Sequence, residues 1–192
     1  RAVGESGDAR PMRLLVLGGS LGATAINEVV PQAVAGVGRG IEIWHQTGRN
    51  KHEQTMAAYH QQMVGGDAEI EPRVDPFIGD MASAYEWADL VLCRAGASTV
   101  AELAAAGVAA ILVPYPHAVD DHQTRNAGWL VDAGAAVLMP QTALNGDSLQ
   151  QLLEEFMADN QRLQIMAQRA RELAVNDAAE RISDICLEVC RG

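Results

Sequence analysis

Short, uninterrupted apolar runs recur along this chain, and a segment with helical spacing follows each of them. Two clear examples are RLLVLGG at residues 13–19 and DLVLCRAG at residues 89–96, both of which end in glycine. Strands that are apolar throughout are typical of a parallel sheet that is covered by helices on both faces. The alternation therefore predicts an α/β fold: a Rossmann-like parallel sheet of about six strands with helices on both faces.

The remaining elements follow from the same alternation. Further strands are expected at residues 41–48, 68–78, 108–116 and 135–140. Helices are expected at residues 23–37, 50–64, 80–88, 98–106 and 121–133, and the chain reads as helical from Asn145 onward with breaks near Asn160 and Asn176. Asp80 is expected to cap the third helix, and Gly107 is expected to end the fourth.

Composition limits the class of protein. The 192 residues suffice for one substantial core, with 48% hydrophobic and 20% charged residues. A net charge of −11 argues against a general nucleic-acid binder. The chain has three cysteines, an odd number, and their spacing is not that of metal ligands: Cys93, Cys186 and Cys190. This usage indicates a reduced, cytoplasmic protein without disulfides or zinc. No apolar run approaches the ~20 residues that a membrane-spanning helix needs. Residues 1–12 are interpreted as a flexible lead-in, and the chain as a fragment of a longer protein.

The ligand site is expected where the strands end, because open parallel sheets bind ligands at the carboxyl ends of their strands. The first such end is GGSLGA, residues 18–23. Its glycines allow a sharp turn and close approach of a ligand, and the amides of the following helix favour an anion. The spacing of Gly18, Gly19 and Gly22 is neither GxGxxG nor a P-loop. A tightly packed strand–helix turn without a ligand is the alternative.

The second end is RAGASTVAE, residues 94–102. Small residues at positions 96–99 expose helix amides and two hydroxyls, which suit a diphosphate. Glu102 follows about one turn later, and a carboxylate accepts hydrogen bonds from a neutral diol such as a ribose. The alternative is that Thr99 and Glu102 are ordinary capping residues.

The third end is the polar loop PYPHAVDDHQTRNA, residues 114–127. Its mixed donors and acceptors suit sugar hydroxyls, whereas the order of His and Asp lacks a metal-binding arrangement, so no metal site is expected. The alternative is a helix cap at Asp120 or Asp121. At two other strand ends, Ile78 could offer an apolar face and backbone to a nucleobase, and His45 is interpreted as a core or rim histidine rather than a catalytic base.

Taken together, these motifs resemble the C-terminal half of the MurG family of bacterial glycosyltransferases. The resemblance rests on GGSLGA, on FIGDMASAYEWADLVLCRAGASTVAELAAAG and on VPYPHAVDDHQTRNA in this order, and it covers nearly all of the chain from Arg13. It implies the C-terminal domain of a two-domain GT-B glycosyltransferase, in which residues 13–192 bind the donor UDP-N-acetylglucosamine without a cofactor. The helices from about residue 160 are then expected to pack toward an absent N-terminal domain.

The resemblance also implies roles for individual residues. Ser20 is expected near the donor phosphates, Ile78 is expected to offer its backbone to uracil, and Gln123 is expected to read the sugar. The residues expected to cradle diphosphate and ribose are Ala97, Ser98, Thr99, Val100, Ala101 and Glu102, with Glu102 on the ribose hydroxyls. Further residues expected to line the site are Gly19, Gly22, Arg94, Gly96, His122 and Arg1.

Two of these positions depart from the family pattern or lie at its edge. His122 stands where the family often has a second glutamine, and Arg1 is a candidate for the arginine that reaches the base. The catalytic base is expected on the absent half, and no residue of this chain is assigned to it.

The function implied is inverting transfer of N-acetylglucosamine to the lipid-linked muramyl-pentapeptide in peptidoglycan synthesis, a step of cell wall biogenesis tied to cell shape and division. The full-length enzyme would be cytoplasmic and peripheral on the inner membrane, which it and its acceptor would meet through the absent half. Three alternatives remain open: a stand-alone UDP-sugar-binding subunit with a membrane-bound partner, half of a UDP-sugar epimerase, and a Rossmann-type reductase. The last is discouraged by GGSLGA and by the lack of an acidic residue after WHQTG.

Overall fold

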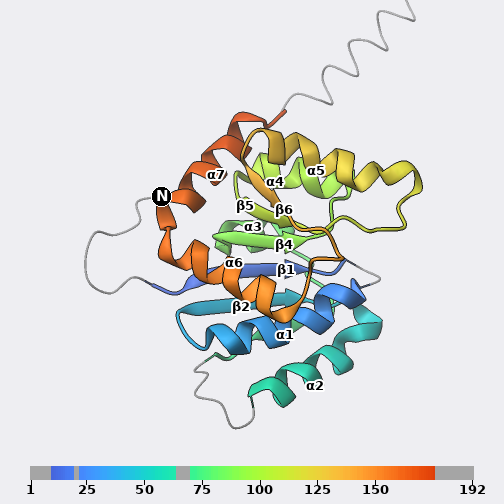
Figure 1. Ribbon diagram of the computed structural model, residues 1–192, viewed down its shortest axis with the longest axis vertical. Coiled ribbons are helices and arrows are strands. Elements are labelled where there is room, and N and C mark those ends of the chain that lie inside the picture. Colours follow the sequence, from blue (N-terminus) through green and yellow to red (C-terminus); the bar gives the residue numbers. More distant parts are fainter. Residues whose placement is uncertain (1–9, 20–21, 64–69, 176–192) are drawn as a thin grey trace, which may run out of the picture.

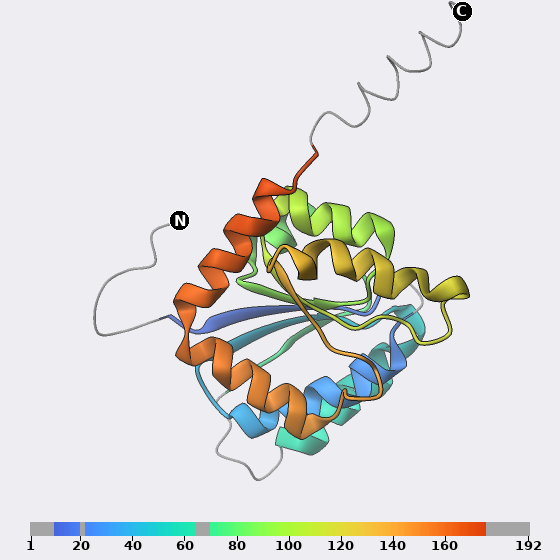
Figure 2. The same ribbon diagram turned by 45° about the horizontal axis from the view of Figure 1, so that its top comes forward.

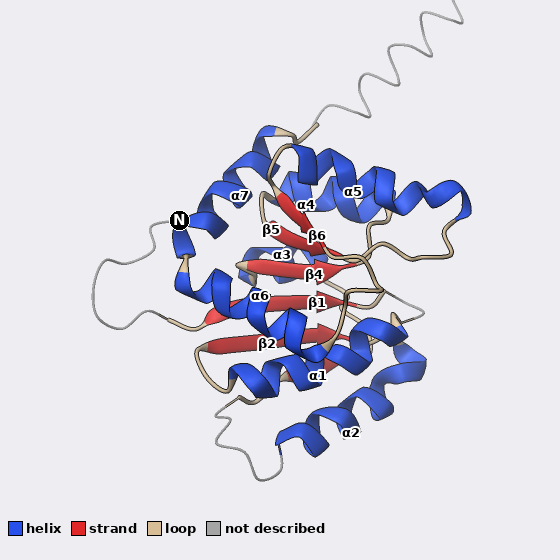
Figure 3. Cartoon of the chain, in the orientation of Figure 1, coloured by secondary structure: helices blue, strands red, loops and turns tan. Residues whose placement is uncertain are grey.

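A six-stranded parallel sheet forms the centre of the computed structural model, which describes residues 10–19, 22–63 and 70–175 (Figures 1 and 3). The strand order is β3-β2-β1-β4-β5-β6, and all pairs of neighbours are parallel. The strands are β1 (Met12–Leu17), β2 (Ile41–Gln46), β3 (Arg73–Asp75), β4 (Leu90–Cys93), β5 (Ala109–Leu112) and β6 (Ala136–Leu138). This is a doubly wound order, and the six parallel strands agree with the Rossmann-like sheet predicted from the alternation of the sequence.

Helices cover both faces of the sheet (Figure 2). They are α1 (Thr24–Val37), α2 (His52–Met63), α3 (Met81–Trp87), α4 (Ala97–Ala106), α5 (His122–Asp132), α6 (Gly146–Ala158) and α7 (Asn160–Glu172), with short 3-10 turns η1 (Arg49–Lys51) and η2 (Val119–Asp121). Residues of α1, α2 and α6 share one apolar core with the sheet, and residues of α3, α4 and α5 share the other. Helix α7 contributes to both cores, through Leu163 and Met166 on one side and Ala170 on the other.

Alternation along the strands produces these two cores. Leu14 and Val16 of β1 face one core, while Leu15 and Leu17 face the other, and all four side chains are buried. Successive side chains of a strand point to opposite faces, so a strand that is apolar at every position can bury both.

The third strand is shorter than expected. Only Arg73–Asp75 pairs with β2, although residues 68–78 are extended in the prediction, of which 68–69 lie outside the described residues. Pro72 and Pro76 flank the paired segment. Proline has no backbone N–H to donate to a ladder, which limits the strand to the three residues between them.

Helix starts and stops follow the predicted capping chemistry. The Asp80 side chain accepts a hydrogen bond from the Ser83 amide at 3.0 Å, and Gly107 ends α4 in the left-handed region with φ 61°. The break expected near Asn160 occurs at Asp159, whose side chain caps α7. Position 176 lies outside the described residues.

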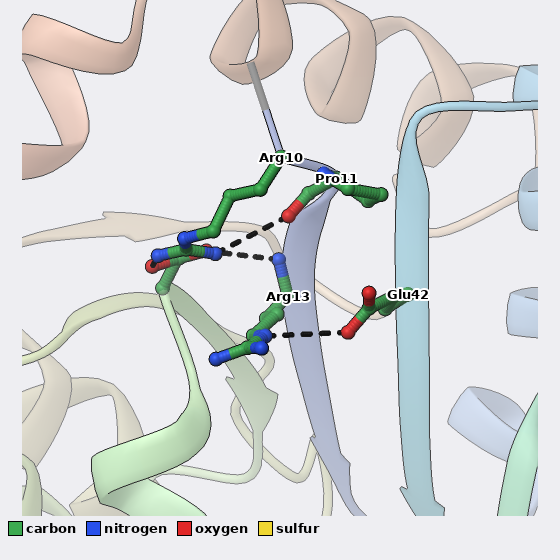
Figure 4. A network of polar contacts seen from close by, with 5 residues as sticks. Arg10, Pro11, Arg13 and Glu42 are labelled. Carbon is green, nitrogen blue, oxygen red and sulfur yellow. Dashed lines mark hydrogen bonds and ion pairs between the residues drawn. The ribbon is translucent and has the colours of Figure 1, made fainter. Parts of the chain in front are cut away.

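Polar contacts tie the chain together at the amino ends of the central strands (Figure 4). The Arg10 guanidinium donates to both carboxylate oxygens of Asp89 at 2.7 and 2.6 Å, and Arg13 Nε donates to Glu42 Oε2 at 3.2 Å. The hydrogen bond to Asp89 outweighs the opposing effect of burial, so the pKa of Arg10 is raised. These ion pairs are at least partly exposed and contribute little stability individually.

Helix α7 is the first of the helices expected from about residue 160, and it packs against α4 and β5 of this same domain. Leu163, Met166 and Ala170 are buried, while Ile165 is 43% exposed. Of the predicted lead-in, residues 1–9 lie outside the described residues, and β1 begins at Met12.

Candidate functional site

The chain reverses its winding between the two central strands. Leu17, the last residue of β1, lies opposite Cys93, the last residue of β4, so the turns after both strands leave the sheet side by side. Helix α1 then runs to one face of the sheet and α4 to the other. Such a switch point opens a crevice at the carboxyl ends of the strands, where doubly wound proteins bind their ligands.

The glycines of the first turn, after β1, lie close to the backbone that follows β2. A Cβ at Gly18 would lie 2.9 Å from the Gln46 carbonyl oxygen, and one at Gly22 would lie 2.6 Å from the Thr47 carbonyl oxygen. Gly19 has φ +75° and open space around it. Tight packing therefore accounts for Gly18, packing together with a φ of +76° accounts for Gly22, and the backbone angle alone accounts for Gly19. Positions 20 and 21, which include the predicted Ser20, lie outside the described residues, as does Arg1.

A buried chain of polar groups lies beneath this turn. Asn27 Nδ2 donates to the Thr47 carbonyl at 2.8 Å, so its Oδ1 faces His45 Nε2 at 3.1 Å and accepts from it. The Nε2 proton leaves Nδ1 as an acceptor, and the Tyr59 hydroxyl donates to it at 3.0 Å. Burial lowers the pKa of His45 to about 3 and raises the pKa of Tyr59. His45 is therefore a neutral core histidine, in agreement with its interpretation from sequence.

The second turn carries the start of α4. Gly96 precedes the helix without a side-chain cap, and its carbonyl accepts the first helical bond from the Val100 amide. The amides of Ala97, Ser98 and Thr99 precede that bond and have no intrahelical acceptor. Ser98 is exposed and Thr99 half-buried. This geometry does not support the capping alternative for Thr99, and it presents a helix N-terminus to an anion.

Glu102 lies further along α4 and is exposed. Its Oε2 accepts a hydrogen bond of 2.9 Å from the hydroxyl of Tyr85 on α3. Burial, followed by this bond to Glu102, raises the pKa of Tyr85, so the tyrosine keeps its proton and donates. Burial, with a smaller contribution from Glu102, raises the pKa of the Cys93 thiol to about 12.

Arg94 forms hydrogen bonds with the loops that follow β5 and β6. Its guanidinium donates to the carbonyls of Val113 and Pro114, both at 3.1 Å, and to Gln141 Oε1 at 2.6 Å. It also lies over the ring of Tyr115, and burial lowers its pKa. Arg94 stands at the predicted strand end, but these contacts direct its charge toward the protein.

The loop between β5 and α5 is held by two side-chain amides. Gln123 Oε1 accepts from the Tyr115 amide at 2.9 Å, and Asn126 Nδ2 donates to the Ala95 carbonyl at 3.1 Å. Asp120 and Asp121 both have left-handed φ angles, of 51° and 52°. Asp121 precedes α5, yet its carboxylate accepts from the Thr124 hydroxyl and caps no backbone amide. Such backbone conformations are rare outside glycine and concentrate at functional sites.

Ile78 lies between β3 and α3 and is 5% exposed as a whole residue, and its side chain packs in the core that it shares with residues of α3 and α4. The apolar face expected of Ile78 is therefore not available to a ligand. The preceding residue, Phe77, is 49% exposed, and the Arg49 guanidinium lies 5.5 Å from its ring centre.

The structure thus gathers the predicted residues unevenly. The turn that holds Gly19 and Gly22 and the turn at Gly96 that leads into α4 leave the sheet side by side at the switch point. Asn126, on α5 with Gln123, donates to the Ala95 carbonyl of the second turn. His122 has contacts of its own within the protein. The roles of Tyr85 and Asn126 were not predicted, although both residues lie inside motifs that the sequence singles out.

Other features lie away from this site or are not found. A cavity of about 450 Å³ lies between α7 and β6, and none of the predicted donor residues lines it. Within the described ranges, no three His, Cys, Asp or Glu side chains are grouped as metal ligands. Among the helices that the structure describes, none has the length and apolar character required to span a bilayer.

A doubly wound parallel sheet with helices on both faces defines a Rossmann-like α/β domain, and an uncapped helix starts at its switch point. Residues 13–182 match the glycosyltransferase family 28 C-terminal domain, and the chain belongs to this family. The family-level resemblance drawn from the motifs is thereby confirmed.

Individual relatives agree with this assignment. The chain is 53% and 52% identical to the enzymes named UDP-N-acetylglucosamine--N-acetylmuramyl-(pentapeptide) pyrophosphoryl-undecaprenol N-acetylglucosamine transferase from Aeromonas hydrophila and Azotobacter vinelandii. These matches cover 96% of this chain and 49% and 51% of the relatives. The crystal structure of Acinetobacter baumannii MurG matches with a TM-score of 0.87 and 43% identity over 95% of this chain and 51% of that one. The predicted fold class is confirmed, and the chain spans about half the length of these curated relatives.

Proposed function

We propose that this chain is the donor-binding half of an inverting glycosyltransferase that moves N-acetylglucosamine from UDP-N-acetylglucosamine to a lipid-linked muramyl-pentapeptide. The observation that carries the proposal is the uncapped start of α4 at the switch point, with the exposed Glu102 further along the same helix. The printed names of the relatives support the choice of sugar and acceptor. They lend no support to the subunit, epimerase or reductase alternatives.

Each of the predicted residues would contact a different part of the donor. The amides of Ala97, Ser98 and Thr99, with the Ser98 and Thr99 hydroxyls, would hold the diphosphate, and Val100 and Ala101 would form the helix wall beside it. Glu102 would accept from the ribose hydroxyls, and the Ile78 backbone would meet uracil. Gly19, Gly22 and Ser20 would approach the phosphates. Gln123 would contact the sugar from the first turn of α5, where its Oε1 accepts from the Tyr115 amide.

In the transfer reaction, this half of the enzyme would stabilise the UDP leaving group. The acceptor hydroxyl oxygen would attack the anomeric carbon, the bond from that carbon to UDP would break, and UDP would leave with the bonding electron pair. Amides fixed at a helix start stabilise the negative charge that grows on the leaving diphosphate, at no reorganisation cost. The proton of the acceptor hydroxyl would pass to a base outside this chain.

The acceptor and the membrane belong to the rest of the enzyme in this proposal. The lipid-linked acceptor would be met through the absent half, and the full-length protein would lie on the cytoplasmic face of the inner membrane and act in cell wall synthesis. No cofactor is assigned, since the donor itself supplies the activated sugar.

Glu102 provides the test. Glu102→Ala should weaken UDP binding by about 1–3 kcal/mol, the range for losing a hydrogen bond to a charged group. Calorimetric titration of the wild-type and variant chains with UDP measures this difference. The control is Glu154→Ala on α6, which lies on the face of the sheet opposite to α4. This substitution also removes an exposed helical carboxylate, and it should leave the titration unchanged. Equal affinity of wild type and Glu102→Ala would remove Glu102 from the site.

A further inference from the structure

The Tyr85 hydroxyl on α3 donates a hydrogen bond to the carboxylate of Glu102 on α4, the residue predicted to bind ribose. The tyrosine is 7% exposed, and its ring belongs to the core formed with α4, including Val100 and Leu103. Burial of the ring leaves the hydroxyl a single well-defined position. The Tyr85 hydroxyl, which donates the hydrogen bond, is therefore fixed in position, while the Glu102 carboxylate that accepts it lies on the surface.

A carboxylate on an exposed glutamate normally has considerable rotational freedom, which binding must remove. In this structure the 2.9 Å bond from Tyr85 holds Oε2 of Glu102. A carboxylate has about four acceptor positions on its two oxygens, so one bond leaves the others for a ligand. The contact thus orients the group without occupying it.

We propose that Tyr85 is a positioning residue for ribose recognition: its hydroxyl holds the Glu102 carboxylate in the orientation that accepts the two ribose hydroxyls. The inference rests on the proposed function, because it presupposes a ribose at Glu102. It adds a link between elements, since α3 begins three residues after Ile78, the residue proposed to meet uracil. One continuous segment, from Ile78 through α3, would then carry both the base contact and the residue that positions the ribose contact.

A purely structural role is the competing explanation, because a mostly buried hydroxyl needs some acceptor. The two explanations differ in what they predict for the ligand. A structural hydroxyl affects every ligand alike, whereas a positioning hydroxyl affects only ligands that carry the ribose diol. UDP and 2′,3′-dideoxy-UDP differ in this diol alone.

The experiment is calorimetric titration of wild type and Tyr85→Phe with both nucleotides. Tyr85→Phe keeps the buried ring, and the freed oxygen of the exposed Glu102 can bind water, so the variant should fold; thermal unfolding checks this. We expect UDP affinity to fall ~3- to 10-fold, and dideoxy-UDP affinity to change less than ~2-fold. In a Glu102→Ala background, Tyr85→Phe should have no further effect on UDP binding.

Tyr59→Phe is the matched control. It also removes a buried tyrosine hydroxyl, but one that bonds His45 in the opposite core. It should lower the melting temperature and leave the ratio of UDP to dideoxy-UDP affinity unchanged.

The outcomes separate the inference from the proposed function. If Tyr85→Phe weakens both nucleotides equally, or neither, the positioning role is refuted while donor binding stands. If wild type binds UDP and dideoxy-UDP equally well, the ribose contact of Glu102 is refuted, and the inference with it. If folded wild type binds no UDP, the proposed function itself fails.

Discussion

Lowering the pH from 7 to 5 should destabilise this protein through one buried residue, His45. The side chain is 0% exposed, and its two ring nitrogens are bonded to Tyr59 and Asn27. In the folded chain its pKa is lowered by burial from the ordinary value of 6.5 to about 3. The unfolded chain binds a proton below pH 6.5, whereas the folded chain does not until far lower pH.

The size of the effect follows from this difference. A histidine whose pKa is lowered in the folded state contributes full stability above pH 6.5, and the contribution is lost as the pH falls from 6.5 toward 3. Each pH unit within that window changes the free energy of unfolding by about 1.4 kcal/mol. Integrated from pH 7 to pH 5, where most carboxylates remain ionised, His45 alone should lower the free energy of unfolding by about 2 kcal/mol.

Urea unfolding at pH 7 and pH 5 measures this loss, with His45→Gln as the matched variant. Glutamine retains a donor and an acceptor but does not titrate, so the variant should be less stable at pH 7 and should lose about 2 kcal/mol less than wild type on acidification. Equal pH dependence of the two proteins would refute the assignment of a buried, neutral His45.

Three substitutions test the turns of the site. Gly18→Ala places a Cβ 2.9 Å from the Gln46 carbonyl oxygen and should cost about 1–3 kcal/mol in thermal or urea unfolding; an unchanged midpoint would contradict the packing. Gly96→Ala meets only Thr99 Oγ1 at 3.6 Å and should change stability by less than about 1 kcal/mol while weakening UDP binding in a titration; full affinity would show that no ligand approaches there. Arg94→Ala removes three hydrogen bonds and should lower stability by about 1–3 kcal/mol; unaltered unfolding would mean that these bonds are dispensable.

Local chemistry explains which parts of the fold could be predicted. The apolar runs of β1 and β4, the cap at Asp80 and the stop at Gly107 depend on residues close in sequence, and all four are confirmed. The extent of β3 depends on which backbone groups pair with β2, and the flanking prolines shorten it to Arg73–Asp75.

Side-chain partnerships between elements could not be read from the sequence. Arg94 bonds to groups 19, 20 and 47 residues away, and Tyr85 bonds to Glu102 across 17 residues. Sequence patterns place such residues at a strand end or on a helix, but they do not say whether a side chain turns toward a ligand or toward the protein. For the same reason, burial of the Ile78 side chain was not foreseen.

Calorimetric titration with UDP-N-acetylglucosamine, with UDP-glucose and NADH as controls, tests the claim that this chain holds the sugar donor of a glycosyltransferase. We predict binding of UDP-N-acetylglucosamine in preference to both controls. A folded chain that binds none of the three, or that binds NADH in preference, would contradict the claim.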